Sequence, residues 1–333
     1  MKKLSQDASK NNKWIITVRK WIILVLFYAI VQILIMTNVI NDYIFSTLVT
    51  VCINVILAVS LNLITGFTGQ FSLGHAGFMS IGAYTCALIT LRYPTVWGFL
   101  GGLLLGAVLA AIVGIFVGLP TLRLKGDYLA IATLGMAEII KIFFRNVLED
   151  LTNGAAGLSG IPQFVNWTWL FVFTAGTVAL ISNFINSSHG RACISVREDE
   201  IAAEAMGINS TKYKVIAFVT GAFFAGIAGA IYSSYFYFIS PDMFDFQKSI
   251  DILVVVVLGG MGSISGSVIA SIVLALISTL LQSFSEVRMV IYGVLLIVIM
   301  LFRPQGIMGS KELSFSVVKK WAQGLRQKNG GIA

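Results

Sequence analysis

Long apolar segments separated by short polar stretches extend along most of this chain. Residues 43–91, 97–119 and 252–285 contain no aspartate, glutamate, lysine or arginine. One helical crossing of a bilayer takes about 20 apolar residues, so the first of these runs is long enough for two crossings. Strands of a membrane barrel would instead show short segments of alternating polarity. The pattern therefore predicts a helical protein that crosses a membrane several times.

The composition agrees with this prediction. Hydrophobic residues make up 57% of the 333 residues, and charged residues make up 11%. A soluble protein of this size could not cover so much apolar surface, so the bilayer is expected to act as its solvent. We expect an all-α polytopic membrane protein with about eight to ten transmembrane helices, forming a single domain over residues 1–333. The candidate spans are residues 21–37, 44–64, 76–91, 97–119, 128–147, 167–185, 215–239, an ambiguous region at 252–285, and 289–302.

The last two apolar regions do not fit simple spans. The apolar run 252–258 ends at glycines, and the segment 289–302 is shorter than a full crossing. At least one segment is therefore expected to be broken or re-entrant. Such a break is tolerated where protein covers the exposed backbone or where the backbone lines a water-filled cavity.

Basic residues indicate which parts of the chain face the cytoplasm. The net charge is +8, and lysine and arginine lie mainly near the two ends and in a central loop, residues 186–214. The positive-inside rule places residues 1–20, the central loop and residues 304–333 in the cytoplasm, which requires an even number of crossings. Residues 149–166 are then expected outside. The apolar run from Trp21 is long and has no obvious small-residue cleavage site, so we expect a retained span rather than a signal peptide. This charge distribution does not indicate nucleic-acid binding.

The central loop contains a polar island at residues 189–207. Six charged side chains fall between Arg191 and Glu204. The acidic residues 198–200 are expected in the first turn of a helix that ends near Gly207, since the helix dipole favours acidic residues at its start and glycine favours its end. The island indicates a docking element for a cytoplasmic motor, and an ordinary solvated loop is the alternative. The residues expected to take part are Arg191, Arg197, Glu198, Asp199, Glu200, Ala202, Ala203 and Gly207.

Two similar glycine-containing breaks interrupt the apolar segments. The first glycine break is Gly66-x-x-Gly69-x-x-Ser72, and the second is Gly259-x-x-Gly262-x-x-Ser265. Paired breaks in the two halves of a transporter point to the substrate route, although glycines can also simply permit tight helix packing. Uncharged polar side chains near the first break could offer hydrogen bonds to a passing solute. The predicted pathway residues are Asn62, Gly66, Gly69, Gln70, Ser72, His75, Gly259, Gly262 and Ser265.

Motifs of other function classes are absent or incomplete. No Gly-x-x-x-x-Gly-Lys-Ser/Thr loop occurs, so the chain is not expected to hydrolyse ATP by that route. The glycines of residues 260–266 imitate a dinucleotide-binding turn, but their spacing is one residue too long and no acidic residue follows about 20 positions later. Cys52, Cys86 and Cys193 lack metal or redox spacing and are expected to be buried small residues. We therefore expect no catalytic activity, and no cofactor or metal bound by this chain.

Two ionisable residues within the apolar regions are ambiguous. Glu138 lies inside a candidate span, and a carboxylate in a membrane is a functional candidate. Lys141 is three positions on and Arg145 four further, so structural pairing is favoured over proton coupling. His75 has no second histidine or carboxylate nearby to complete a metal site, which favours a packed, hydrogen-bonded residue.

Four segments together carry a resemblance to a known family. They are residues 62–83 (NLITGFTGQFSLGHAGFMSIGA), 119–146 (LPTLRLKGDYLAIATLGMAEIIKIFFRN), 152–162 (TNGAAGLSGIP) and 190–266. The chain resembles the permease subunit of bacterial ABC importers for branched-chain amino acids, specifically the longer of the two paired permeases. The resemblance implies a second permease subunit, two cytoplasmic ATPase subunits that use ATP, and an extracytoplasmic substrate-binding protein.

The resemblance also implies that the polar island is the loop that couples to the ATPases. That loop carries a Glu-Ala-Ala-x-x-x-Gly pattern across ABC importers. Here Ala202-Ala203-x-x-x-Gly207 fits, whereas Ile201 stands in the place of the glutamate, Glu200 is one position early and the usual downstream proline is absent. We expect an importer for leucine, isoleucine or valine in the bacterial cell membrane. An ABC permease for urea or short amides, and a stand-alone channel or ion-coupled carrier, remain as alternatives.

Overall fold

The computed structural model describes residues 22, 24–124, 126–280, 293–294, 297, 301 and 306–309. The predicted cytoplasmic ends, 1–20 and 304–333, and the predicted last span, 289–302, lie almost wholly outside these residues. The chain divides into two compact units, Met1–Val49 and Thr50–Ala333. In the first unit the apolar helix Leu24–Met36 ends in a turn where Asn38 has a positive φ of 54°. The helix α2, Asp42–Thr65, begins in this unit and continues into the second.

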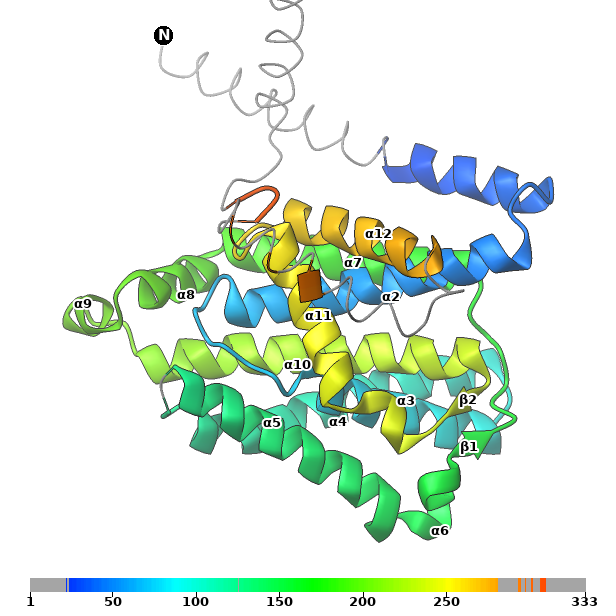
Figure 1. Ribbon diagram of the computed structural model, residues 1–333, viewed down its shortest axis with the longest axis horizontal. Helices are drawn as coiled ribbons and strands as arrows, with labels where there is room; N and C mark the ends of the chain where they lie inside the picture. Colours follow the sequence, from blue (N-terminus) through cyan, green and yellow to red (C-terminus); the bar gives the residue numbers. More distant parts are fainter. Residues whose placement is uncertain are drawn as a thin grey trace, which may run out of the picture. The chain divides into compact units, whose positions relative to one another are not determined.

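Helices account for most of the described residues of the second unit (Figure 1). Among the described residues, α2, α4 (Val96–Thr121), α7 (Trp167–Asn186) and α10 (Ser210–Phe236) are each long and apolar enough to cross a membrane. The predicted all-α polytopic class is therefore confirmed, while the full number of crossings stays a prediction. Besides α2, the long helices are α3 (His75–Arg92), α4 (Val96–Thr121), α5 (Asp127–Ile142), α7 (Trp167–Asn186), α10 (Ser210–Phe236), α11 (Phe246–Gly259) and α12 (Ile264–Leu280).

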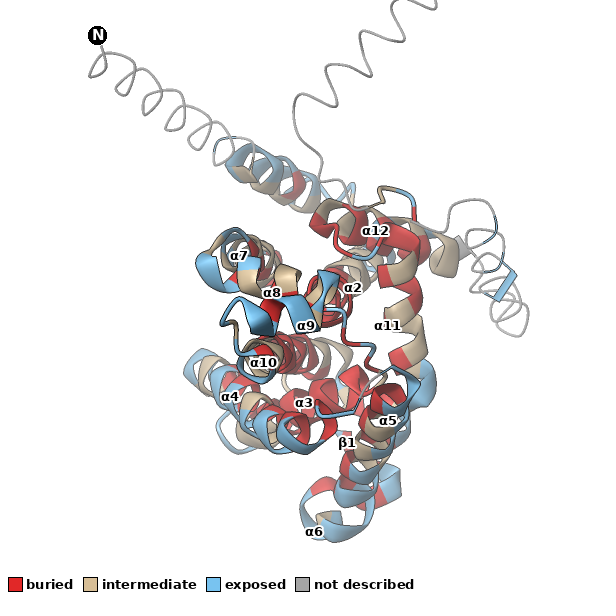
Figure 2. Cartoon of the chain, turned by 90° about the vertical axis from the view of Figure 1, so that its left-hand side faces the viewer, coloured by how far each residue is buried: buried red, intermediate tan, exposed pale blue. Residues whose placement is uncertain are grey.

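The core of this unit is formed by α3, α4 and α10, which pack side by side (Figures 1 and 2). Glycines allow their backbones to approach closely. A Cβ added to Gly82 would lie 2.0 Å from the carbonyl oxygen of Gly226, and one added to Gly229 would lie 1.9 Å from that of Met79. Helices associate in lipid through such close packing, because lipid is as apolar as the side chains. Figure 2 shows that the buried residues gather where these helices meet.

The segment expected outside the membrane, residues 149–166, has more structure than the sequence predicted. It includes α6 (Glu149–Thr152), a 3-10 turn (Gly154–Ala156) and the strand β1 (Leu158–Ser159), and it follows a π-helical turn (Phe143–Val147) at the end of the predicted span 128–147. β1 pairs antiparallel with β2, Phe238–Ile239. The predicted span 215–239 was therefore wrong at its end, because α10 stops at Phe236 and Tyr237 turns the chain with a φ of 63°. The pair β1–β2 lies at one end of α10, opposite α8 (Ser188–Glu198) and α9 (Glu200–Ala205) (Figure 1).

The ambiguous region 252–285 resolves into two helices within the described residues. α11 ends at Gly259 and α12 begins at Ile264. Between them Gly260 and Gly262 have φ values of 111° and 89°, which residues with a side chain rarely adopt. The prediction of a broken apolar segment is confirmed here.

Candidate functional site

The two glycine breaks, far apart in sequence, meet in space. The amide nitrogen of Gly262 donates a hydrogen bond to Oδ1 of Asn62, with an N···O distance of 2.8 Å. Nδ2 of Asn62 donates to the carbonyl oxygen of Ser263 and to Oγ of Ser267, both at 2.9 Å. Asn62 is fully buried. Its amide therefore joins the last turn of α2 to the start of α12.

The contact between the breaks leaves no room for a side chain. A Cβ added to Gly66 would lie 1.8 Å from Oδ1 of Asn62 and 2.3 Å from the nitrogen of Gly262. Glycine at position 66 is therefore required by close approach. Close packing is therefore shown at this break. The lining of a substrate route stays a prediction.

Arg197 connects this junction to the central loop. Its Nη1 donates a hydrogen bond to the carbonyl oxygen of Gly66 at 2.8 Å. The same guanidinium pairs with the carboxylate of Glu198. A Cβ added to Gly262 would lie 2.9 Å from Nη1 of Arg197, so the second break also contacts this side chain. One arginine thus contacts both breaks from the central loop.

The central loop folds into two short helices at one end of α10 (Figure 1). α8 spans Ser188–Glu198 and α9 spans Glu200–Ala205. Oδ1 of Asp199 accepts a hydrogen bond from the nitrogen of Ala202 at 3.0 Å and so caps α9. Gly207 follows α9 with a φ of 85°. The helix ending near Gly207 is confirmed, but Glu198 was wrongly placed in its first turn, because it is the last residue of α8.

Ion pairs and hydrogen bonds fix α9 against the start of α10. Nζ of Lys214 lies 2.5 Å from Oε1 of Glu200, and Oγ of Ser210 donates to the carboxylate of Glu204. Oδ1 of Asn209 caps α10 by accepting from the nitrogen of Lys212 at 2.9 Å. The central loop is therefore an ordered structure, while its predicted role as a docking element stays a prediction.

The outer face of the loop exposes apolar side chains that the sequence analysis did not select. Ile201 and Met206 are 78% and 83% exposed. Ala203 is buried, whereas Ala202 and Gly207 are exposed. These two side chains are available for contact with a partner, although single exposed apolar residues are common on protein surfaces. The sequence did mark Ile201, because this residue occupies the position at which the family pattern has glutamate.

The remaining predicted loop residue, Arg191, makes a hydrogen bond at the start of the loop. Its Nη1 donates to the carbonyl oxygen of Asn186, at the end of α7, over 3.1 Å. Cys193 on the same helix is buried, and this burial raises the pKa of its thiol to about 11. Arg191 itself is exposed, and its role in ATPase coupling stays a prediction.

His75 is a packed residue at the start of α3. Its Nε2 lies 2.8 Å from Oγ of Ser60, and its side chain is 1% exposed. Ser72 is also buried, and its hydroxyl accepts a hydrogen bond from the nitrogen of Gly74 at 3.4 Å. These contacts support the structural interpretation of His75, while the predicted pathway role of both residues stays a prediction.

The other predicted pathway residues divide between the junction and a neighbouring cavity. Gly259 packs against Gly266, and Oγ of Ser265 lies 3.2 Å from Oγ of Ser263. Gly69 approaches Cγ of Arg197, since an added Cβ would lie 3.0 Å from it. Gln70 lines the cavity beside the central loop. The structure thus brings Asn62, Gly66, Gly69, Gly262 and Arg197 together, whereas the side chain of His75 contacts that of Ser60.

Glu138 takes part in an ion-pair network at the end of α5. Its Oε2 lies 3.7 Å from Nζ of Lys141. Lys141 also lies 3.6 Å from Oδ1 of Asp242, and Arg145 lies 3.5 Å from the same atom. The favoured interpretation of structural pairing is supported by this geometry. Asp242, which the sequence analysis did not select, joins α5 to the segment before α11.

These features define a polytopic helical membrane protein whose broken segments are joined to a structured loop outside the bundle. The chain belongs to the family described as branched-chain amino acid transport system / permease component, whose model matches residues 43–300. The protein is thus a permease-type transport subunit, as the resemblance predicted. No solved structure matches this chain.

Several curated proteins are similar to this chain. LivM of Salmonella typhimurium, a high-affinity branched-chain amino acid transport system permease protein, is 36% identical over 77% of this chain and 68% of its own length. LivM of Escherichia coli has the same identity and coverage. LivH of Escherichia coli is 26% identical over 78% of this chain and 92% of its own length. The similarity to the longer permease is therefore the greater of the two.

Proposed function

We propose that this chain is the transmembrane subunit of an ATP-driven importer that carries leucine, isoleucine and valine into the cell. Its family and the names of its relatives support this substrate class. The structural observation that carries the mechanism is the hydrogen bond from Arg197 to the carbonyl oxygen of Gly66. It joins the loop that would face a motor to the segments that would have to move for a solute to pass.

The partners follow from this function. A second permease subunit would pair with this chain, and two cytoplasmic ATPase subunits would bind the central loop and use the ATP. An extracytoplasmic binding protein would deliver the substrate and supply most of the selectivity. This chain would bind no cofactor, and its ends, residues 1–20 and 304–333, would lie in the cytoplasm together with the central loop, residues 186–214.

The mechanism uses the rigidity of the central loop. Exposed Ile201 and Met206 would seat the loop in a cleft of the ATPase. Movement of α8 would then carry the guanidinium of Arg197, and with it the carbonyl of Gly66 and the junction that Asn62 holds. Because packed interfaces switch between discrete arrangements, a small loop displacement could open one side of the junction and close the other.

The test is uptake of radiolabelled leucine into right-side-out vesicles that contain the complete complex, with and without internal ATP. We expect uptake to require ATP and to fall at least tenfold in Arg197→Glu and in Glu198→Lys. Arg92→Glu is the matched control, because Arg92 is exposed in the last turn of α3 and outside the central loop. Uptake without ATP would favour a channel or carrier, and competition by urea but not by isoleucine would favour a permease for short amides.

A further inference from the structure

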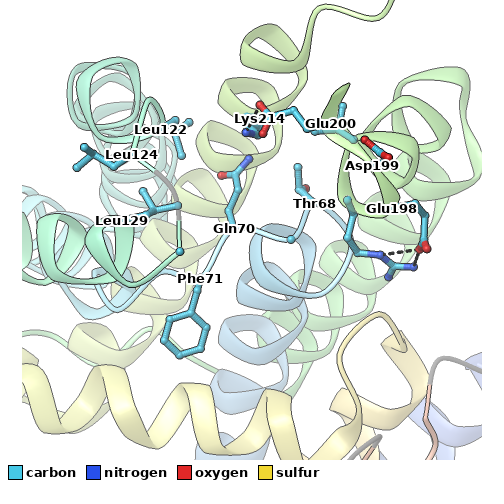
Figure 3. A pocket seen from close by; sticks show the side chains of 14 residues that line it. Thr68, Gln70, Phe71, Leu122, Leu124, Leu129, Glu198, Asp199, Glu200 and Lys214 are labelled. Atoms are coloured by element: carbon cyan, nitrogen blue, oxygen red, sulfur yellow. Dashed lines mark hydrogen bonds and ion pairs between the residues drawn. The ribbon is translucent and has the colours of Figure 1, made fainter. Parts of the chain in front are cut away.

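A cavity of about 280 Å³ lies between the central loop and the connection from α4 to α5 (Figure 3). One wall is apolar and consists of Leu122, Leu124 and Leu129. Gln70, from the first glycine break, projects between this wall and the central loop with its amide end toward Lys214, as Figure 3 shows. The neighbouring Phe71 side chain points away from them.

Gln70 is the most unusual residue of this cavity. Its side chain is 3% exposed, yet neither Oε1 nor Nε2 has a hydrogen-bond partner. Buried polar side chains almost always have partners, because burial without a hydrogen bond is costly. An amide offers both donors and an acceptor. The cavity is therefore suited to an occupant that presents a hydrogen-bond acceptor and a donor at the same place.

The wall opposite the leucines carries charges of both signs. Lys214 and Glu200 form an ion pair there, and their side chains are 13% and 25% exposed. Glu198 and Asp199 line the same side. A simple anion would meet repulsion from these carboxylates, and a simple cation would meet repulsion from the ammonium group. A molecule that carries both charges is complementary to this wall.

We propose that this cavity binds a free aliphatic α-amino acid, such as leucine. The carboxylate would lie toward Lys214 and Nε2 of Gln70, the ammonium group toward the acidic residues and Oε1 of Gln70, and the alkyl chain against the three leucines. A volume of about 280 Å³ is below the ~300–1,000 Å³ that is typical of sites for drug-sized ligands, which suits a smaller molecule. This inference rests on the proposed function in two respects. The proposed function places the cavity on the cytoplasmic side, and it indicates which class of amino acid is present there.

Binding at this site would regulate transport. An occupant would contact the central loop and the start of α5 at once, and would favour the arrangement of the loop seen in this structure. A ligand shifts an equilibrium between conformations by its difference in affinity for them. Amino acid that has accumulated in the cytoplasm is therefore expected to slow its own import.

The experiment measures binding of radiolabelled leucine to the purified full-length chain in lipid nanodiscs, without ATPase subunits. We expect saturable binding that weakens at least tenfold in Gln70→Leu and in Leu129→Trp, which would fill the cavity. The matched controls are Gln163→Leu and Lys212→Met, because neither residue lines the cavity. Gln70→Leu removes an unpaired amide at similar volume, so its thermal unfolding temperature is expected to stay at or above that of the wild type.

Two analogues separate a zwitterion site from an ion site. Leucinamide lacks the carboxylate and 4-methylpentanoate lacks the ammonium group, and each is expected to bind at least tenfold more weakly than leucine. Absence of saturable leucine binding would mean that the cavity holds water only and would overturn the proposal. Equal binding of an analogue, or binding unaffected by both cavity variants, would also overturn it.

Uptake by the complete complex is measured separately, so that failure of the cavity site can be distinguished from failure of the importer function. ATP-dependent uptake without binding to the nanodisc-held chain would refute the cavity site and leave the importer function intact. Binding that depends on Gln70, without ATP-dependent uptake, would refute the importer function and leave the site. With both present, leucine preloaded on the cytoplasmic side is expected to reduce initial uptake severalfold in the wild type but not in Leu129→Trp.

Discussion

The guanidinium of Arg197 donates a hydrogen bond to the carbonyl oxygen of Gly66, a residue 131 positions earlier in the chain. The acceptor is a backbone atom in the turn after α2, so the contact constrains the path of the main chain itself. Charge-assisted hydrogen bonds of this kind are shorter and stronger than neutral ones. A displacement of α8 would therefore move the main chain at Gly66, and not only a flexible side chain.

Combined charge reversal separates this contact from the neighbouring ion pair. Arg197→Glu with Glu198→Lys can restore an ion pair between positions 197 and 198, but a carboxylate at position 197 cannot donate to the carbonyl of Gly66. We expect ATP-dependent uptake of the double variant to stay at least tenfold below that of the wild type. Recovery to wild-type uptake would show that the ion pair alone matters.

Substitution of Gly66 tests the contact between the breaks. Gly66→Ala would place a Cβ 2.3 Å from the nitrogen of Gly262, and the resulting displacement is expected to lower the free energy of unfolding by about 1–3 kcal/mol. The matched control is Gly101→Ala in α4, where an added Cβ meets nothing within 4 Å. Thermal unfolding in detergent, followed by fluorescence, measures both. Equal unfolding temperatures for the two variants would contradict the close contact.

Cysteine labelling tests the placement of the central loop. Burial raises the pKa of the Cys193 thiol to about 11, so its reactive thiolate is scarce at neutral pH and increases about tenfold per pH unit below that value. Maleimide labelling of the wild type at pH 7 is therefore expected to be slow and to accelerate as the pH rises. Met206→Cys introduces an exposed thiol on the same loop and is expected to label rapidly, until bound ATPase subunits protect it. Fast labelling of Cys193 itself at pH 7 would show that α8 does not bury it.

Substitution of Glu138 distinguishes structural pairing from proton coupling. In Glu138→Gln the amide retains the size of the side chain, and Lys141 retains its contact with Asp242. ATP-dependent uptake is expected to stay within about twofold of the wild type, because removal of a partly exposed ion pair changes stability little. Initial rates measured at several external pH values provide the check. Abolished uptake with intact ATPase binding would assign a transport role to Glu138.

Particular residues show how far the sequence allowed prediction. The apolar runs predicted α4 and α7 to within a few residues, because a long apolar helix has few alternatives in a bilayer. The glycine spacing identified both breaks. Neither the apolar runs nor the glycine spacing shows which distant residues lie close together. The hydrogen bond between Asn62 and Gly262 could therefore not be predicted from one sequence. Asp242 was inconspicuous for the same reason, since its importance depends on what lies opposite it. Gln70 was selected as a pathway residue, but its lack of a hydrogen-bond partner could not be read from the sequence.

The junction formed by Asn62 also has a consequence for how the protein is made. Its hydrogen-bond partner at Gly262 lies 200 positions later. At a synthesis rate of about 5–20 residues per second, α2 waits roughly 10–40 s before the partner backbone leaves the ribosome. During that time the carboxamide of Asn62 lacks the backbone partners that it has in the folded chain. The junction can therefore form only late in synthesis, and ribosome stalling before α12 would delay it.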